Sequence, residues 1–443
     1  MSAKSQTVTD WNPENPSAWD SKLAWSTLWT TTFSLMLGFM VWYLVSSLAP
    51  LLNGAGMLGE GAIATSRAYW LASMPGLAGG LLRLVWTFLP PIMGTRNMVI
   101  WSTVALMAPT AGWIWILSVP NPPFSAMMVL AFLTGIGGGV FSGYMPSTSY
   151  FFPKKRQGVA LGLQAGIGNF GVSVVQLLTP IVVTMALFGT ASVIHTPNKP
   201  DKQVWLQTAP ALIIPLLIIS AILAMVFLKS VPIKANFAQQ FDIFRNKHTW
   251  IMTLQYLLTF GIFSGLAGQF GNLLKALYSV VPTIAWLGGT TIAFLGAFIG
   301  SLARVAWGPF CDRFGGGIWT MVAGLGIAAS SLPVILALRT DVPGEKDLVP
   351  LALFLTGMFF IFFFAGVGNA STFKQMPMIF EPRQAGGVIG WTGAIAAFGP
   401  FLFGLAFDTF SKTSVFYFVL LYALLCAGLA WWFYARRNAE ARS

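Results

Sequence analysis

Twelve apolar segments, each long enough to cross a lipid bilayer, dominate this 443-residue sequence and restrict what it can fold into. A spanning helix needs roughly 20 apolar residues, because the hydrocarbon core is about 30 Å thick and a helix rises about 1.5 Å per residue. With 56% hydrophobic and 9% charged residues, the chain lies outside the range of soluble domains. The expected spans are 27–53, 66–92, 97–118, 123–151, 157–189, 208–229, 250–273, 284–310, 318–338, 349–378, 385–407 and 414–435. We therefore expect an all-α integral membrane protein with twelve transmembrane helices.

Basic residues concentrate in the loops on one side of these spans. An even number of spans puts both termini on one side, and the loops there hold fifteen Lys and Arg against seven opposite. Because cytoplasmic loops carry the excess of positive charge, we expect both termini in the cytoplasm. The net charge of +12 is explained in this way, so nucleic-acid binding is not expected. The first 26 residues lack a basic region leading into a short apolar stretch, so no cleavable signal peptide is expected.

The two halves of the sequence resemble each other. The segment GGLLRLVWTFLPPIMG, ending at Gly94, aligns without gaps with GSLARVAWGPFCDRFG, ending at Gly315, so span two repeats as span eight. In the same way FFPKKRQGVALGLQAGIGNFG of span five repeats as IFEPRQAGGVIGWTGAIAAFG of span eleven. Two parallel six-helix repeats are the architecture of the major facilitator superfamily, which binds its substrate between the halves. The expected division is an N-terminal segment 1–26, six-helix bundles 27–229 and 250–435, a central cytoplasmic loop 230–249 and a tail 436–443.

Three basic residues are expected at membrane depth: Arg83, Arg304 and Lys374. Each arginine precedes its loop glycine by eleven residues, which places it about 16 Å from the cytoplasmic end of its helix. All thirteen Asp and Glu fall in loops, termini or the last turn of a span. A central charge costs at least about 2.5–3.5 kcal/mol and normally pairs or faces a cavity. With no carboxylate at that depth, the simplest partner is a soluble anion.

The chemistry of guanidinium narrows the choice of anion. Its fork of N–H groups matches two oxygens of a planar oxyanion such as carboxylate, nitrate or nitrite, whereas phosphate and sulfate favour a wider pocket. Two alternatives stay open at this point. Either arginine could bond to helix carbonyls freed by nearby Pro and Gly, and Lys374 could extend its long side chain to the cytoplasmic edge.

Glycines are regularly spaced in spans five and eleven. GIGNFG, residues 166–171, fits the dinucleotide pattern G-x-G-x-x-G, but it lies in a spanning helix without the required strand and acidic residue. We expect a face of small residues that lets helix backbones touch, although ordinary close packing explains most such faces. The amide of Asn169 needs a partner in lipid and could donate to an anion. The glycines concerned are Gly162, Gly166, Gly168 and Gly171 in span five, and Gly386, Gly390 and Gly393 in span eleven.

With these residues in view, the chain resembles the nitrate/nitrite porter family of the major facilitator superfamily over essentially its full length. GVALGLQAGIGNFGVSVVQLLTP is similar to the nitrate signature of that family, and GVIGWTGAIAAFGPF is its weaker counterpart. The resemblance implies substrate arginines at Arg83 and Arg304, an amide donor at Asn169, and aromatic residues enclosing the flat anion at Phe141, Tyr256 and Phe260. Taken without the resemblance, such aromatics are usually core or lipid-facing.

Lys374 departs from the family pattern, which the resemblance indicates has a neutral amide there. Burial and neighbouring positive charge both favour the neutral form of a lysine. We therefore expect Lys374 to be the candidate proton carrier, which puts simple nitrate/nitrite exchange in doubt.

These features predict a secondary transporter rather than an enzyme, in the inner membrane of a bacterium. The leading expectation is import of nitrate by symport with protons, as in nitrate assimilation, by a monomer in contact with membrane lipid and without cofactors. A nitrate/nitrite antiporter is the alternative, and an anion channel with an arginine ring is a weaker one. His195 and His248 lie in loops without further ligands nearby, so no metal site is expected. Cys311 and Cys426 are too few for a disulfide framework.

Overall fold

The chain forms a helical bundle with one small hairpin. The computed structural model describes residues 7–8, 10–17, 19–194, 201–231, 241–278, 292–340 and 348–443, with the backbone alone for 382–383. The elements are α1 (Ser21–Gly54), α2 (Gly61–Ile116), α3 (Phe124–Thr134), α4 (Ile136–Gly139), α5 (Phe141–Ser149), α6 (Lys154–Val182), β1 (Ser192–Ile194), β2 (Lys202–Val204), α7 (Thr208–Phe227), η1 (Phe241–Arg245), α9 (Lys247–Tyr256), the π-helix η2 (Leu257–Gly261), α10 (Ile262–Tyr278), α12 (Ala293–Phe314), α13 (Gly316–Thr340), α14 (Leu348–Ile379), α15 (Pro382–Ala396), α16 (Gly399–Thr409), α17 (Lys412–Ala430) and the π-helix η3 (Trp431–Ala435). Strands β1 and β2 pair antiparallel.

Every expected span corresponds to helix. In the described part of the chain, eleven helices are long and apolar enough to cross a membrane. One of them, α2, consists of two helices that meet at Gly94, where the backbone is not helical, and these correspond to the expected spans 66–92 and 97–118. Residues 279–291, which include the start of span 284–310, lie outside the described residues. So do 232–240, which are part of the expected central loop, and His195.

The repeat seen in the sequence is also a repeat of backbone conformation. Gly94, at the kink of α2, has φ 72°, and Gly315, between α12 and α13, has φ 92°. These two glycines end the aligned segments of spans two and eight. Since L-residues rarely adopt positive φ, glycine is required where each pair of helices turns back.

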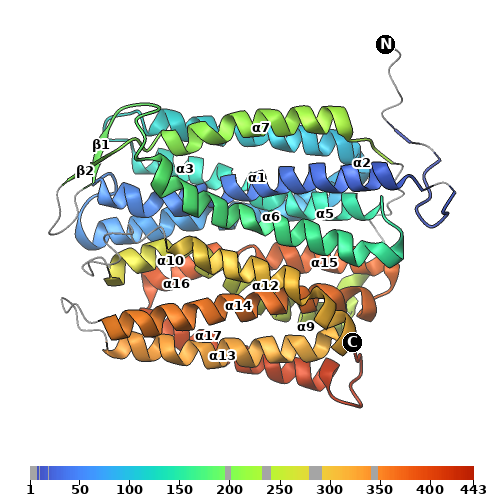
Figure 1. Ribbon diagram of the computed structural model, residues 1–443. Coiled ribbons are helices and arrows are strands. Elements are labelled where there is room, and N and C mark those ends of the chain that lie inside the picture. The colour runs from blue at the N-terminus through green and yellow to red at the C-terminus, as the bar shows by residue number, and fades with distance from the viewer. Residues whose placement is uncertain are drawn as a thin grey trace, which may run out of the picture.

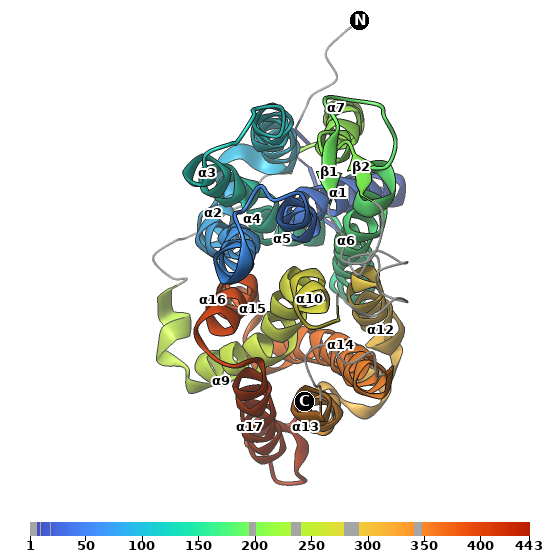
Figure 2. The ribbon, with the colours of Figure 1, turned by 90° about the vertical axis from the view of Figure 1, so that its left-hand side faces the viewer.

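The helices form two groups that face each other. Figure 1 shows α1 to α7 in the upper half of the molecule and α10 to α17 in the lower half, with both chain ends at the right. Viewed along the helices, the two groups remain separate (Figure 2). We call α1 to α7 the first group and α9 to α17 the second group. The end of the bundle that carries both termini is the terminal end, and the opposite end is the distal end.

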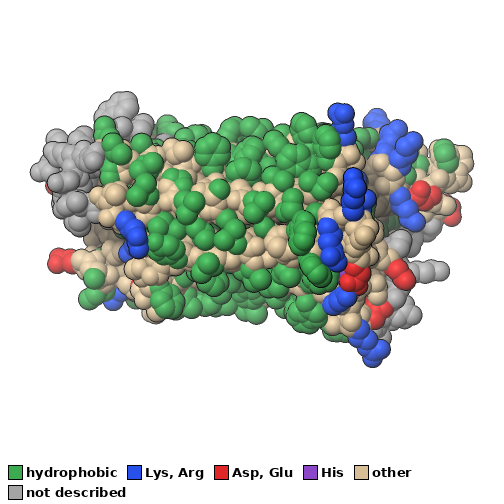
Figure 3. Space-filling model, turned by 90° about the horizontal axis from the view of Figure 1, so that it is seen from below, with side chains coloured by type: hydrophobic (Ala, Val, Ile, Leu, Met, Phe, Trp, Pro, Cys, Tyr) green, Lys and Arg blue, Asp and Glu red, His purple; other side chains and the backbone are tan. Residues whose placement is uncertain are grey.

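The outside of the bundle has the pattern of a membrane protein. Hydrophobic side chains cover the long flank in Figure 3, while Lys, Arg, Asp and Glu gather at its ends, with more blue side chains at the terminal end. Phe418 and Val226 are 68% and 67% exposed, which in water would be unfavourable but against lipid is not.

Candidate functional site

Arg83 lies fully buried where the two groups meet. Its Nε donates to the carbonyl of Gly138, 2.9 Å away in the first group, and its Nη1 donates to the carbonyl of Gly393, 2.7 Å away in the second group. Nη2 is buried without a hydrogen-bond partner among the described residues. The alternative that this arginine bonds to helix carbonyls therefore holds in part, and one nitrogen is left for a ligand.

Arg304, the counterpart of Arg83 in the repeat, lies on α12 and is 5% exposed. Its Nη1 also has no hydrogen-bond partner among the described residues. The two guanidinium groups are close enough for their charges to disfavour each other. Two buried like charges with unsatisfied N–H groups are unfavourable by themselves, so the arrangement favours an anion between them.

Aromatic rings surround the arginines. The Cζ atom of Arg83 lies 4.7 Å from the ring centre of Phe141 and 4.9 Å from that of Phe260. Phe260 stacks on Tyr256 with the ring planes 6° apart, and Phe141 stacks on Phe260 at 23°. The three aromatics expected from the resemblance are thus brought together in near-parallel planes, as the walls of a slot for a flat ligand would be.

A fourth aromatic residue, Phe373 on α14, was missed by the sequence reasoning. Its ring lies 4.8 Å from the Cζ of Arg304, as the rings of Phe141 and Phe260 do for Arg83. It also meets the rings of Tyr256 and Phe141 with centroid separations of 5.1 and 6.1 Å. The sequence signal for Phe373 is its position directly before Lys374, the neighbouring residue that was expected at membrane depth instead.

A π-helix positions the aromatics of the second group. Residues 257–261 form η2, between α9 and α10. The wider turn of a π-helix is rare and is frequent at functional sites. Tyr256 directly precedes this segment, Phe260 lies within it, and the two rings stack on each other.

Asn169 is fully buried on α6, and neither its amide nitrogen nor its oxygen has a partner among the described residues. The neighbouring glycines bring α6 close to other helices. A Cβ added at Gly171 would overlap the Met36 carbonyl of α1, one at Gly168 would lie 2.6 Å from the Leu35 side chain of α1, and one at Gly166 would overlap Val305 of α12. Val305 directly follows Arg304, and Asn169 follows Gly166 by three residues. This contact therefore places Asn169 and Arg304 within about one helical turn of each other in depth.

The remaining glycines differ in whether another helix lies close to them. Gly393 supplies the carbonyl that holds Arg83, and Gly390 sits against Thr87, one turn from that arginine. At Gly162 and Gly386, an added Cβ would have no atom of the described residues within 4 Å. The expectation of a close helix contact is therefore wrong for these two positions.

Lys374 does not join the arginines. Its ammonium group forms an ion pair with Asp312 near the terminal end of α12, and the lysine side chain is 40% exposed. The expectation that this lysine lies at mid-depth without a carboxylate partner is wrong. Helices α12 and α14 run side by side, so a carboxylate two turns beyond Arg304 comes within reach of a flexible lysine.

The distal end is closed by hydrogen bonds between the groups, which we call the distal seal. Gln269 donates to the carbonyl of Tyr69 at 3.2 Å, and Asn272 donates to that of Ala68 at 3.1 Å. Further bonds of the same kind run from Lys275 to the Pro50 carbonyl, from Gln176 to the Ala267 carbonyl, from Tyr43 to the Ser264 carbonyl and from Trp70 to Asp408. Access to the site in this conformation is therefore blocked from the distal end.

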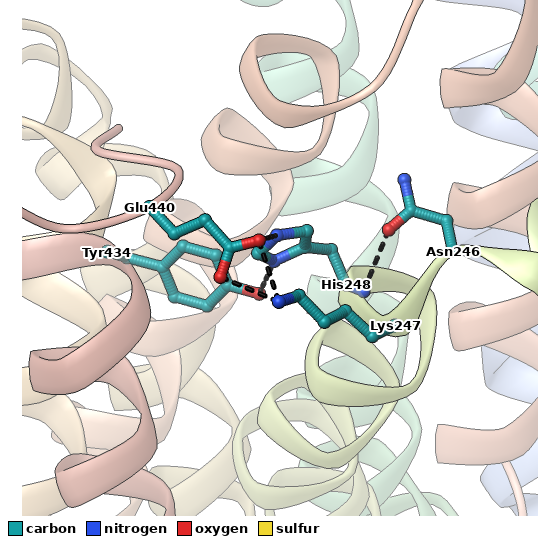
Figure 4. Close-up of polar contacts among 5 residues, drawn as sticks. All are labelled: Asn246, Lys247, His248, Tyr434 and Glu440. Carbon is teal, nitrogen blue, oxygen red and sulfur yellow. Dashed lines mark hydrogen bonds and ion pairs between the residues drawn. The ribbon is translucent and has the colours of Figure 1, made fainter.

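A second polar cluster lies at the terminal end, away from the site (Figure 4). The Glu440 carboxylate lies 2.7 Å from the Lys247 ammonium and 3.5 Å from His248 Nε2, whose ring reaches the Tyr434 hydroxyl at 3.1 Å. Asn246 caps α9 by accepting from the backbone N–H of His248 at 2.9 Å. His248 is thus not an isolated loop residue but part of a contact that holds the tail against α9. No short sequence motif predicts this contact between the tail and α9.

Comparisons with known proteins show the family of the chain. The sequence matches the Major Facilitator Superfamily over residues 27–397. It is 52% identical to the probable nitrate/nitrite antiporter NarK2 of Thermus thermophilus over 448 aligned positions, which cover 99% of each chain. It is 32% identical to the nitrate/nitrite transporter NarU of Escherichia coli (strain K12), with 97% of this chain and 96% of that protein covered.

Among solved structures, the chain is similar to a D-xylose-proton symporter with a TM-score of 0.65 and 16% sequence identity. The match covers 92% of this chain and 97% of the symporter. At that identity, the similarity concerns the fold.

Proposed function

Because the chain belongs to the Major Facilitator Superfamily, and within it to the nitrate/nitrite porters, we propose that it transports nitrate across the inner membrane of a bacterium by alternating access. Segments 27–229 and 250–435 are the two bodies that rock about the site. The terminal end, with both chain ends, faces the cytoplasm, as its excess of positive charge favours.

The observation that carries this proposal is the pair of buried arginines. Arg83 and Arg304 come from symmetric positions in the two groups, each keeps an unsatisfied guanidinium nitrogen, and stacked aromatic rings lie beside them. A planar monovalent anion satisfies the N–H groups, offsets the charge and fits between flat walls. Nitrate and nitrite both have this chemistry.

The return step favours exchange with nitrite. Two fixed guanidinium charges disfavour an empty site, so the protein returns more readily when another anion is bound. No Asp, Glu or His appears around the arginines among their described contacts. Exchange of one anion for another needs no group that binds and releases a proton, so this arrangement favours antiport.

Proton-coupled import is the second candidate. Lys374 would be the carrier, and the observation in its favour is the ion pair with Asp312, which joins α12 to α14. Opening and closing of that ion pair during the transport cycle would couple the binding and release of a proton to nitrate transport.

Proteoliposomes separate the two. One set of vesicles receives an inward proton gradient, and another is preloaded with nitrite and has no gradient. Uptake of nitrate only into the nitrite-loaded vesicles supports antiport, whereas concentrative uptake on the proton gradient alone supports symport. Lack of saturable nitrate uptake in both sets contradicts the proposed function, and an ohmic current indicates a channel.

A further inference from the structure

A second buried amide in the bundle has no assigned purpose. Asn369 on α14 is 0% exposed, and neither its nitrogen nor its oxygen has a hydrogen-bond partner among the described residues. A primary amide has two donor hydrogens and an acceptor oxygen, and leaving all of them unsatisfied in a membrane protein is unfavourable. An amide in this state indicates a ligand that the chain itself does not supply.

Helix packing places Asn369 at the depth of the second arginine. A Cβ on Gly366 of α14 would overlap the carbonyl oxygen of Gly300 on α12, so the two backbones touch there. Both helices run toward the terminal end. Asn369 follows its contact glycine by three residues and Arg304 follows its own by four, so the two differ in depth by about 1.5 Å.

The side of α14 that carries Asn369 is the side that faces the site. Asn369 and Phe373 are four residues apart and therefore share a helix face. Phe373 lies 4.8 Å from the Arg304 guanidinium and against the Tyr256 ring. One residue before Asn369, Gly368 packs on Thr259 of η2, the segment that contains Phe260.

The internal repeat gives an independent argument. The segment GIGGGVFSGYMP, 135–146, aligns without gaps with GVGNASTFKQMP, 366–377, and Asn369 then corresponds to Gly138. Gly138 supplies the carbonyl that accepts from Arg83 Nε. The first group thus has bare backbone beside its arginine, whereas the second group carries an amide side chain at the equivalent position of the repeat.

From these observations we propose that Asn369 is a substrate-contacting residue that donates an N–H to the transported planar anion. With Asn169 in the first group, each helix group then contributes one arginine and one amide. The anion is then held by both groups at once, which ties its binding to their relative position. This inference rests on the proposed function and adds a specificity-determining residue to it.

The test compares nitrate binding by purified variants, measured as the nitrate-dependent rise in melting temperature. Asn369→Leu keeps the size of the side chain and removes its donors, and we expect apparent affinity to fall about tenfold or more, as does Asn169→Leu. Thr372→Val is the matched control, because its buried hydroxyl already bonds to the Gly368 carbonyl of its own helix. The control is expected to bind nitrate like the wild type.

Asn369→Asp provides a second variant of the same shape. A carboxylate beside Arg304 takes the place of the anion, so we expect nitrate binding to be abolished while the protein remains folded. Wild-type affinity in Asn369→Leu or in Asn369→Asp, with Asn169→Leu impaired, overturns this inference and leaves the proposed function standing. A wild-type protein that shows no response to nitrate contradicts the proposed function itself.

Discussion

Arg83 and Gly393 are joined by a hydrogen bond of 2.7 Å between Nη1 and the carbonyl oxygen, although 310 positions separate them in the sequence. The bond links α2 of the first group to α15 of the second group at the level of the site. One buried side chain thus connects the two helix groups. In the proposed function, the same guanidinium also binds the anion.

We expect Arg83→Lys to weaken nitrate binding more than Arg304→Lys does. An ammonium group cannot serve the two carbonyls of Gly138 and Gly393 and also present donors side by side to an anion. Loss of one charged hydrogen bond corresponds to about 1.5–3 kcal/mol, roughly a tenfold to hundredfold loss of affinity. Titration of nitrate against melting temperature measures it, with exposed Arg339→Lys as the control. Near-wild-type affinity in both site variants contradicts the assigned role of the guanidiniums.

We expect alanine at Phe141, Tyr256, Phe260 or Phe373 to reduce the preference for flat nitrate over tetrahedral anions. Parallel rings exclude a tetrahedral ion by shape, and truncation of one wall removes that exclusion. Competition of nitrate uptake by perchlorate and phosphate gives the ranking. Phe418→Ala, in a lipid-facing side chain, is the matched control. An unchanged ranking in all four variants identifies the rings as packing residues.

We expect Lys374→Gln to leave nitrate/nitrite counterflow intact, because the lysine pairs with Asp312 instead of lying among the arginines. Asp312→Asn is the partner variant and should behave in the same way if the pair acts as a unit. If the wild type also concentrates nitrate on a proton gradient and Lys374→Gln loses that activity alone, proton coupling through this pair is supported. Loss of counterflow in Lys374→Gln contradicts its position outside the site.

Two glycines of α6 should respond in opposite ways to alanine. A Cβ at Gly171 would overlap the backbone of α1, which cannot move aside locally, whereas a Cβ at Gly162 meets nothing within 4 Å. Overpacking of this kind costs about 1–3 kcal/mol, while alanine in open helix is neutral or slightly favourable. Melting temperatures of Gly171→Ala and Gly162→Ala test the difference. Equal melting temperatures would mean that α6 and α1 are not in contact.

The contact between the tail and α9 should depend on pH. The hydrogen bond from Lys247 holds the pKa of the Glu440 carboxyl below its ordinary value of 4.5. Such a group stabilises the fold above its ordinary pKa, and the contribution is lost as the pH falls through the lowered value. The difference in melting temperature between wild type and Glu440→Gln should therefore be present at neutral pH and disappear in acid. Glu60→Gln, at an exposed helix cap without a side-chain bond, serves as the control.

The sequence was sufficient to predict the spans, because a bilayer permits little except apolar helices. Their number, order and repeat follow from run length and from aligned segments such as those ending at Gly94 and Gly315. The site arginines also could be predicted, since a charge in an apolar run is conspicuous. Helix ends were less well predicted: the span expected at 157–189 is α6, which ends at Val182.

The ion pair of Lys374 could not be read from the sequence. Whether a lysine at the end of a span lies inward or reaches a carboxylate depends on which helices are adjacent, and Asp312 is 62 positions away. The same holds for Phe373 and Asn369, whose significance comes from the face of α14 that packs on α12. A helix that is apolar on all sides has no periodic pattern of polar residues that would identify its packed face. The face of α14 that packs on α12 is therefore known only from the structure.

The three bonds that α10 donates to the distal seal respond differently to inherited substitutions at their donors and at their acceptors. Gln269, Asn272 and Lys275 of α10 act as donors, and their acceptors include main-chain carbonyls of α1 and α2. A carbonyl survives any replacement of the side chain beside it, so inherited substitutions at the acceptor positions leave these bonds in place. Substitutions in the three donors remove them. These three bonds are thus robust to mutational drift at their acceptor positions and vulnerable to it on α10, where compensating changes are expected to arise.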